Sequence, residues 1–469
     1  MFAYITKRIK VGSNDHGPRL WMEGKYLIPS GFIPGLRYSA TVDGNKLLLS
    51  IATDGTRIIS AKARNGQRIP VLDLNSRQLL QMFEGMSAVR IILKRGKVYV
   101  MPLASEVRRK ERLNRLMTKL ASGDALRVGS LCHGGGVMSR AVHEGLAEGG
   151  IESRIGFANE VREDLLNQSL ECNPMWDENS QFIAAPVQEV AFDEYGSGQI
   201  GLCELAEVSL PCSGASVAGR SKNKISMPEE HPDVGHLLVS ALAIIARCNP
   251  VAMIWENVEA YFKSASGAII RNQLRDLGYT LHERVLKGTE FNELEDRSRT
   301  CIVAVTEGMV FSFEDLVYPE KTIRHLGEIL EDLPDNDSRW STMTGLKEKE
   351  LRDKEARKGF RMQVFAPGDT RIGCITKGYA KVRSTDPKIA HPSDPNLLRQ
   401  LTPIEHARAK GIPEEIVSGL SQTTAHELLG QSVLFAPFKA VGNLVARCLK
   451  RFKEEGEVAF TPQQTRIAA

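Results

Sequence analysis

Between residues 126 and 305 the chain alternates short apolar segments with amphipathic helical segments, and this alternation restricts the fold more than any other feature. Repeated strand and helix units produce an α/β sheet whose strands are mostly parallel. Such sheets bind ligands at the carboxyl ends of their strands, so we expect the functional site at that edge. Strands are predicted in LRVGSLC, RIGFANE, QFIAA, EVSLP, VAMIWEN and TCIVAV, and helices over 138–148, 162–171, 234–247 and 265–277.

The first 104 residues have a different pattern, in which short apolar segments alternate with Gly, Asn and Asp turns. This pattern predicts an N-terminal β-rich domain over 1–104, made of one or two small barrels or hairpin sheets. The next segment, EVRRKERLNRLMTKL (106–120), places Leu113, Leu116 and Leu120 on one helical face. We therefore predict a basic helical linker over 105–125.

The remaining segments suggest further divisions. Residues 306–397 are charged, irregular and rich in Gly, Pro and basic residues, with a polar helix expected around 345–358. Residues 398–455 are predicted to form amphipathic helices that return to the α/β domain of 126–305. The stretch 456–469 is predicted to be a flexible tail.

Composition limits the class of protein. The 469 residues are 42% hydrophobic, which is enough for a large core. No stretch reaches the roughly 18 apolar residues of a spanning helix, and the start MFAYITKRIK has no signal-like apolar core, so we expect a cytoplasmic protein with no membrane contact. The eight scattered cysteines form no C-x-x-C pair, which predicts neither a disulfide frame nor a metal site. The net charge of +4 permits a polyanionic partner.

A cysteine stands where the apolar run EVSLPCSGASVAG (207–219) breaks into small residues. Pro211 restricts its own φ angle, and the small residues after Cys212 leave the loop with little side-chain bulk. At the open edge of a sheet this thiol could meet a substrate, although a buried structural cysteine beside a proline is the commoner case.

Four other segments favour the interpretation of Cys212 as a thiol that meets a substrate. The glycine loop LCHGGG (131–136) follows a strand and opens a helix, which lets backbone N–H groups approach a nucleotide-like ligand. Glu160 closes the next strand and is placed to accept hydrogen bonds from a ribose. WENVEAY (255–261) ends another strand with a carboxylate, and LEDRSRTCIVAV (294–305) puts two arginines before the last core strand.

In this order the segments resemble the bacterial and phage DNA cytosine-5 methyltransferases over about residues 126–450. RQLTPIEHARAKGIP (399–413) and LLGQSV (428–433) resemble the last two motifs of that family. The resemblance implies a Rossmann-like S-adenosylmethionine-dependent methyltransferase domain over 126–305, a small irregular target-recognition domain over 306–397, and the N-terminal β-rich domain outside the family.

The resemblance also implies the chemistry. A cysteine thiolate attacks C6 of cytosine, and C5 then takes a methyl group from S-adenosyl-L-methionine. Cys212 matches the nucleophile, Glu256 the group at N3 and Arg299 the group at O2. Asn257 is expected to brace the nucleophile loop and Arg297 to order the site.

The expected cofactor-binding residues lie in the glycine loop, around the acidic strand end, and in the nucleophile and last motifs. They are Leu131, Cys132, His133, Gly134, Gly136, Glu160, Val161, Pro211, Gln431 and Ser432.

The target base must be flipped out of duplex DNA to reach these groups. The expected DNA-binding residues after the nucleophile are Ser216, Arg220, Lys222 and Lys224, and those in the target-recognition domain are Arg361, Arg371, Lys377, Lys381 and Arg383. Double-stranded DNA is the implied partner, with a cognate restriction endonuclease as a further one, and a nucleoid-associated location follows. The sequence leaves the oligomeric state and the target site open.

Several positions depart from the family pattern, most of them around the cofactor pocket. An acidic residue and an aromatic are usual where Ser130 and Cys132 stand, and an aromatic is usual at Val161. A catalytically degenerate DNA-binding regulator is therefore one alternative, and an RNA cytosine-5 methylase is another. Residues 19–49 faintly resemble the AbrB-like swapped-hairpin barrels, which dimerise and bind DNA; the alternative is a β domain that packs on the core or recruits a partner.

Overall fold

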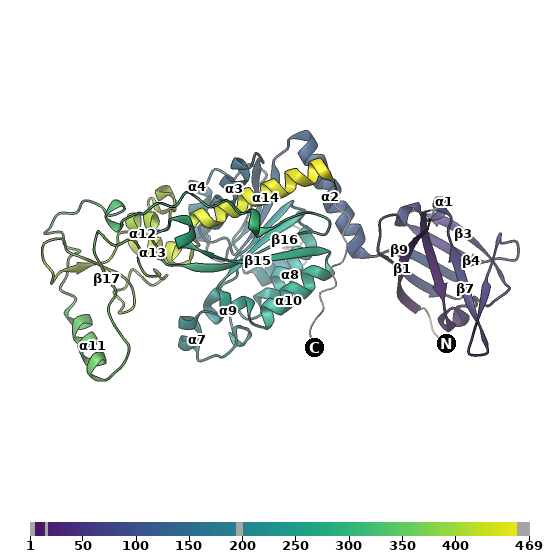
Figure 1. Ribbon diagram of the computed structural model, residues 1–469, viewed down its shortest axis with the longest axis horizontal. Coiled ribbons are helices and arrows are strands. Elements are labelled where there is room, and N and C mark those ends of the chain that lie inside the picture. Colours follow the sequence, from purple (N-terminus) through teal and green to yellow (C-terminus); the bar gives the residue numbers. More distant parts are fainter. Residues whose placement is uncertain (1–4, 15–16, 194–199, 457–469) are drawn as a thin grey trace. The chain divides into compact units, whose positions relative to one another are not determined.

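The computed structural model describes residues 5–14, 17–193 and 200–456, and the chain divides into two compact units, Met1–Glu111 and Arg112–Ala469 (Figure 1). The boundary lies within helix α2 (Ala104–Ser122), which covers residues 105–122 of the segment predicted as a helical linker over 105–125. Apart from Gly456, the tail predicted over 456–469 lies outside the described residues.

The first unit is a nine-stranded antiparallel sheet in the order β5-β3-β4-β9-β8-β1-β2-β7-β6. The long strand β1 pairs with β8 through its first half and with β2 through its second, so the two halves of the sheet share it. One core fills the space that they enclose. The strands are β1 (Ile5–Asn14), β2 (Gly17–Glu23), β3 (Arg37–Asp43), β4 (Lys46–Ile51), β5 (Arg57–Ile58), β6 (Ser60–Arg64), β7 (Gln67–Leu74), β8 (Ala88–Lys94) and β9 (Lys97–Pro102).

Strand β1 has only a weak apolar alternation, because polar and basic residues interrupt its apolar positions in ITKRIKVGSN. The resemblance of residues 19–49 to AbrB-like barrels stays a prediction.

The second unit is built on a seven-stranded sheet in the order β12-β11-β10-β13-β14-β16-β15. The strands from β12 to β14 are parallel neighbours, and β16 runs antiparallel to both β14 and β15. The sheet is therefore mostly parallel, as the alternating pattern predicts. The strands are β10 (Leu126–Leu131), β11 (Ser153–Asn159), β12 (Gln181–Ile183), β13 (Leu205–Val208), β14 (Ala252–Asn257), β15 (Tyr279–Lys287) and β16 (Ser298–Thr306).

Helices cover both faces of this sheet, and the residues of β14 alternate between the cores on its two faces. Its residues Ala252 and Ile254 join the core that contains α3 and α14, whereas Met253 and Trp255 join the core that contains α8 and α10 (Figure 1). Successive strand residues point to opposite faces, so a continuous apolar strand needs cover on both sides. The helices are α3 (Val137–Glu148), α4 (Glu163–Cys172), α5 (Val187–Phe192), α8 (Leu237–Cys248), α9 (Glu259–Phe262), α10 (Ala265–Asp276) and α14 (Phe435–Glu455).

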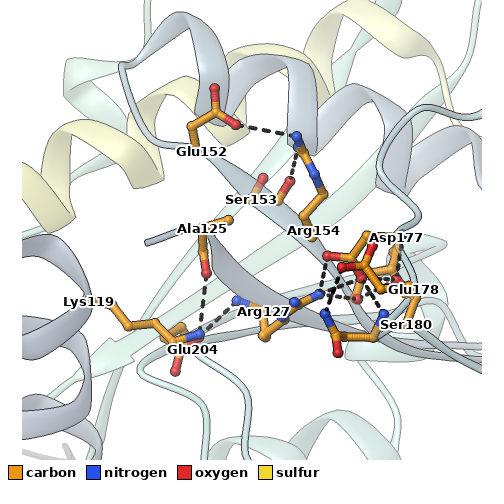
Figure 2. A network of polar contacts seen from close by, with 12 residues as sticks. Lys119, Ala125, Arg127, Glu152, Ser153, Arg154, Asp177, Glu178, Ser180 and Glu204 are labelled. Atoms are coloured by element: carbon orange, nitrogen blue, oxygen red, sulfur yellow. Dashed lines mark hydrogen bonds and ion pairs between the residues drawn. The ribbon is translucent and has the colours of Figure 1, made fainter. Parts of the chain in front are cut away.

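A buried carboxylate at the start of β13 fixes the end of α2 to the sheet. Glu204 accepts hydrogen bonds from Nε of Arg115, Nζ of Lys119 and the backbone N–H of Arg127, each at 2.8 Å. Figure 2 shows Lys119, Arg127 and Glu204 in this network. Because three donors surround one buried carboxylate, its charge is compensated and α2 is held against the amino-terminal edge.

Residues 306–397 contain little regular structure, and their apolar side chains form a small core together with Leu294, Leu401 and Ala409. The elements there are η6 (Phe313–Asp315), η7 (Leu326–Glu328), α11 (Thr344–Glu355), β17 (Val364–Phe365) and β18 (Lys388–Ala390), and β19 (Leu398–Arg399) completes a three-stranded sheet. Helix α11 matches the polar helix expected near 345–358. Backbone bonds join Ile372 to Leu294 and Asp296, each at 2.8 Å, and attach this segment to the α/β domain.

The chain then returns through α12 (Pro403–Ala409), η8 (Glu414–Val417) and α13 (Gln422–Gln431) to α14. Within the described ranges, no single helix has both the length and the apolar character to cross a bilayer; α13 and α14 meet that test only as a pair bent by 48°.

Candidate active site at the carboxyl edge of the sheet

Cys212 lies in the turn that follows β13, at the carboxyl edge of the sheet. Pro211 precedes a short 3₁₀ turn, η3 (Cys212–Gly214), and α7 (Val217–Asn223) follows it. The backbone N–H groups of Ala215 and Ser216 both donate to the carbonyl oxygen of Cys212 at 2.9 Å. The side chain of Cys212 is half-buried. The loop therefore holds a partly accessible thiol in a defined position.

The small residues after the cysteine have a packing reason. A Cβ at Gly219 would overlap the carbonyl oxygen of Ser213, and a Cβ at Gly214 would lie 2.7 Å from the carbonyl oxygen of Pro228. Glycine is thus required at both places for the chain to fold back on itself.

Glu256 and Arg299 form an ion pair beside the thiol. Glu256, near the end of β14, is 7% exposed, and its Oε1 lies 2.9 Å from Nε of Arg299 at the start of β16. Its other oxygen, Oε2, accepts a hydrogen bond of 2.7 Å from the hydroxyl of Ser209. Burial and the neighbouring Arg297 lower the pKa of Arg299, whereas Glu256 and the Cys212 thiol act in the opposite direction. The three predicted catalytic groups therefore share one electrostatic environment.

Asn257 joins the end of β14 to the nucleophile loop. Its Nδ2 donates to the carbonyl oxygen of Leu210 at 2.9 Å, and its Oδ1 accepts from the N–H of Val258 at 2.8 Å. The side chain is buried, so these bonds are shielded from water. This is the contact expected of a residue that braces the loop before Cys212.

Arg297 is buried, and its hydrogen bonds connect three parts of the chain. Its guanidinium donates to Oε1 of Glu295 at 3.2 Å, to Sγ of Cys374 at 3.2 Å and to the carbonyl oxygen of Gly430 at 3.0 Å. Burial opposes its charge, but Glu295 outweighs this effect and the pKa of Arg297 is raised. Lys410 pairs with the other oxygen of Glu295 at 2.6 Å. Arg297 thus orders the edge rather than facing the space beside the thiol.

The glycine loop lies at the end of the adjacent strand β10. Gly134 and Gly136 have φ values of 58° and 76°, and Cys132 has 55°, which is uncommon for a residue with a side chain. A Cβ at Gly134 would meet nothing within 4 Å, so the backbone there borders open space. The carboxylate of Glu160 accepts from the N–H of Gly134 at 2.8 Å and from the N–H of Arg162 at 3.0 Å. Each oxygen keeps further acceptor capacity for a ligand.

The side chain of His133 supports the glycine loop through two buried hydrogen bonds. Its two ring nitrogens lie 2.9 Å from Oγ of Ser130 and 2.7 Å from Oγ of Ser169, and burial lowers its pKa to about 3. The side chain of His133, predicted to bind the cofactor, is therefore directed into the protein. Any contact with a ligand would come from its backbone.

The resemblance leads us to expect an acidic residue at position 130, where this chain has Ser130. A buried carboxyl group lies opposite it on the neighbouring strand. Ser130 of β10 is in register with Glu207 of β13. Glu207 is 1% exposed, and among the described residues neither of its oxygens has a hydrogen-bond partner within normal distance. Burial raises the pKa of Glu207 to about 7, and the nearby hydroxyls of Ser139 and Ser130 act against this rise.

The other predicted cofactor residues differ in exposure. Val161 is 65% exposed next to Glu160, and Gln431 is exposed at the end of α13. Leu131 is buried, whereas Cys132, Pro211 and Ser432 are half-buried. Burial and the nearby Glu160 raise the pKa of Cys132 to about 12, which favours the neutral thiol.

The DNA-binding residues predicted after the nucleophile lie on and around α7. Ser216 caps this helix, accepting from the N–H of Gly219 at 3.1 Å. Arg220 is half-buried and donates to the carbonyl oxygen of Ser226 at 3.3 Å, whereas Lys222 and Lys224 are exposed. Two of the three cations are thus fully presented to solvent.

Three contributors to the site were missed in the sequence. Ser209 holds Glu256, Cys374 contacts Arg297, and Glu207 lies behind the glycine loop. A polar residue inside an apolar strand is a usable signal for Ser209 and Glu207. No local signal marks Cys374, which lies 77 residues from its partner.

Comparisons with known proteins identify the family of the chain. Residues 199–446 match the model of the family described as C-5 cytosine-specific DNA methylase. The Type II methyltransferase M.SsoII of Shigella sonnei is 27% identical over 256 residues, covering 52% of this chain and 64% of that protein. The tRNA (cytosine(38)-C(5))-methyltransferase of Schizosaccharomyces pombe is 24% identical over 256 residues, covering 49% of this chain and 73% of that protein.

A solved structure supports the fold. The crystal structure of the S. pombe Dnmt2 methyltransferase superposes with a TM-score of 0.54 at 19% identity, covering 70% of this chain and 99% of that one. The chain spans less than two thirds of the length of M.SsoII. The family match covers more than half of the 469 residues and contains Cys212, Glu256 and Arg299. The chain therefore belongs to the C-5 cytosine-specific DNA methylase family.

Proposed function

We propose that this chain transfers a methyl group to C5 of a cytosine flipped out of duplex DNA, with S-adenosyl-L-methionine as the donor. The observation that carries the proposal is the placement of the Cys212 thiol beside the Glu256–Arg299 ion pair, at the edge of the sheet that also bears the glycine loop.

Cys212 is the nucleophile in this proposal. Cytosine C5 reacts poorly with an electrophile, and adding the Cys212 thiolate to C6 moves the ring π electrons toward C5. The guanidinium of Arg299 interacts electrostatically with the thiol, so a cation lies close to the proposed nucleophile. After methylation, loss of the C5 proton and departure of the sulfur from C6 restore the aromatic ring and the thiolate.

Glu256 and Arg299 stabilise the charge that develops on the ring. In this proposal the Glu256 carboxyl group donates a proton to N3, and the Arg299 guanidinium donates hydrogen bonds to O2, so each acts where negative charge builds up as the sulfur adds. Their mutual contact of 2.9 Å and the hydroxyl of Ser209 fix the two groups before a base arrives. Asn257 is a positioning residue, because it acts through the loop that carries Cys212.

The residues at the glycine loop fit S-adenosyl-L-methionine, which when bound supplies an electrophilic methyl group. The open backbone at Gly134 provides close approach, and Glu160 has acceptor capacity left for ribose hydroxyls. Exposed Val161 offers an apolar surface to the adenine. The other backbone and side-chain contacts would come from Leu131, Cys132, His133, Gly136, Pro211, Gln431 and Ser432.

Two parts of the chain are proposed to hold the DNA. Ser216, Arg220, Lys222 and Lys224 would contact the backbone near the flipped base. Residues 306–397 would serve as the target-recognition domain, where Arg361, Arg371, Lys377, Lys381 and Arg383 are all exposed. We further propose a cytoplasmic, nucleoid-associated location and a cognate restriction endonuclease as a partner.

Transfer of label from S-adenosyl-L-methionine to cytosine-containing duplex DNA tests the proposal. The intact protein should label the DNA, and the Cys212→Ala variant should not. Bisulfite sequencing of DNA from expressing cells should then locate the methylated site. DNA binding without any transfer by the intact protein would contradict the proposal and favour the degenerate regulator.

An RNA substrate is the second candidate, and the similarity to a protein named as a tRNA methyltransferase favours it. Equal amounts of duplex DNA and tRNA should be offered in the same assay. We expect label in the DNA, and label confined to the tRNA would overturn the choice of substrate while leaving the chemistry of Cys212 in place.

A further inference from the structure

Positive charge is concentrated in the N-terminal unit. Residues 1–111 contain 19 lysines and arginines and 8 aspartates and glutamates, a net charge of +11. The other 358 residues contain 42 basic and 49 acidic residues, a net charge of −7. The small overall charge therefore hides a strongly basic β unit joined to an acidic methylase unit.

Four of these cations share the outer face of the sheet. On β8 the side chains of Val89, Ile91 and Leu93 are fully buried, so the alternating residues Arg90 and Lys94 point outward. The register places Arg8 of β1 opposite Arg90, and Lys97 of β9 opposite Lys94. All four are exposed. We call Arg8, Arg90, Lys94 and Lys97 the basic face.

The basic face is electrostatically unfavourable in isolation. Like charges directly opposite each other on neighbouring strands repel and destabilise a sheet. Among the described residues, no carboxylate lies within ion-pair distance of any of the four. By contrast, Arg19, Lys46 and Lys62 of the same unit pair with Asp73, Asp43 and Glu23. A bound polyanion would supply the missing negative charge.

The layout of the basic face suits B-form DNA. Arg8 and Arg90 form one row and Lys94 and Lys97 another, with Ile92 opposite Tyr99 between them. Four residues along a strand separate the rows by about 13 Å, close to the roughly 12 Å width of the major groove. The major groove of A-form RNA is deep and narrow, so it fits less well.

The same face lacks what a membrane-binding surface needs. Interfacial binding combines cations with exposed apolar side chains. Of the large hydrophobic residues exposed in the described part of this unit, none lies on β1, β8 or β9.

We propose that the basic face binds the phosphate backbone of duplex DNA, at a sequence-independent site separate from the methylase unit. The choice of DNA among polyanions rests on the proposed function. The site adds affinity for any duplex, because phosphate contacts carry no sequence information.

Binding of the full-length protein to an A·T-only duplex tests this directly, because such a duplex offers no cytosine to the Cys212 site. Affinity is measured by fluorescence anisotropy over a range of salt concentrations. The variants Arg8→Gln/Arg90→Gln and Lys94→Gln/Lys97→Gln each remove one row. The control Lys46→Gln/Lys62→Gln removes the same charge from residues that are already paired.

Each row variant should weaken binding about tenfold near physiological salt and lower the slope of log affinity against log salt by about 2, and the control should change both much less. Equal effects of row and control variants would overturn the proposal, as would tighter binding of the intact protein to RNA duplexes or to vesicles containing phosphatidylserine. Labelled methyl transfer by the same variants separates the two proposals. If transfer fails in the intact protein while the row variants still lose A·T binding, the proposed function fails and the basic face stands.

Discussion

The two halves of the active-site edge are built in different ways. Around Cys212 the site consists of side-chain functional groups, since Glu256 contacts both Arg299 and Ser209 directly. Around the glycine loop the site is formed by the backbone conformation, with left-handed φ values at Cys132, Gly134 and Gly136. A side chain that performs chemistry has few substitutes, whereas a backbone shape can be supported by many side chains. This difference offers a physical reason why most departures from the family pattern lie around the expected cofactor pocket.

The supports of the glycine loop show how such replacement works. Ser130 and Ser169 hold His133 beneath the loop, and Glu207 places a carboxyl on the strand beside Ser130. In this chain the loop is thus supported by hydrogen bonds among Ser130, His133 and Ser169. The comparison predicts losses of turnover at the first half and losses of cofactor binding or stability at the second.

The largest effect is expected from Glu256→Gln. The amide keeps the shape but removes the group that we propose to protonate N3 and breaks the ion pair with Arg299, so kcat should fall on the order of 10³-fold with little change in the KM for S-adenosyl-L-methionine. Single-turnover methyl transfer measures this. Glu259→Gln, at an exposed carboxylate three residues on, should behave like the unchanged protein. Unimpaired turnover in the Glu256→Gln variant would contradict the claim that the Cys212 half of the site depends on specific side chains.

Gly136→Ala should act on binding instead. A Cβ there would collide with Oγ of Ser169 and the ring of His133, and the φ of 76° is strained for alanine. We expect the Kd for S-adenosyl-L-methionine, measured by calorimetry, to rise about tenfold, equivalent to roughly 1.4 kcal/mol. Gly201→Ala, with an ordinary φ and open space at the Cβ position, is the matched control. Unchanged cofactor affinity in the Gly136 variant would argue against a backbone-built pocket.

Glu207→Gln should change the pH dependence of stability. Because the pKa of Glu207 is raised to about 7, the native state binds a proton between about pH 4.5 and 7 that the unfolded state has released. Stability from this group is therefore lost as pH rises through that window, by up to about 3 kcal/mol. The variant should gain unfolding free energy relative to the unchanged protein from pH 5 to 8 in urea titrations. Glu171→Gln, on the surface, should show no such trend.

The smallest effect is expected from Ser130→Ala. The change removes one of two hydrogen bonds to His133 and leaves the other, to Ser169, in place. The unfolding free energy should fall by about 1 kcal/mol, with at most a few-fold change in cofactor affinity. A loss of cofactor binding as large as that of Gly136→Ala would show that the side chain at 130 contributes directly.

Local sequence patterns were sufficient for the main features of the sheet and for the nucleophile turn. The strands from β10 to β14 are mainly apolar, and Pro211 and Cys212 lie in the turn that follows β13. Strand β15 escaped prediction because it carries polar residues in YTLHERVLK at the edge of the sheet, where burial does not enforce an apolar pattern.

Contacts between distant residues were the other part that the sequence did not predict. Arg297 meets Cys374 and Gly430, which lie 77 and 133 residues away, and the register of Ser130 with Glu207 depends on which strands are neighbours. Such pairings follow from the tertiary arrangement and have no local pattern. For the same reason, the inward direction of the His133 side chain could be found only in the structure.

Covalent trapping tests the central claim most directly. The intact protein is incubated with S-adenosyl-L-methionine and a duplex carrying 5-fluorocytosine at the methylated position, and the adduct is digested and mapped by mass spectrometry. The fluorine cannot leave as a proton does, so the bond between the enzyme and C6 persists. Our account predicts one nucleotide-modified peptide, with the modification on Cys212. Methyl transfer without such an adduct, or an adduct on another cysteine, would contradict it.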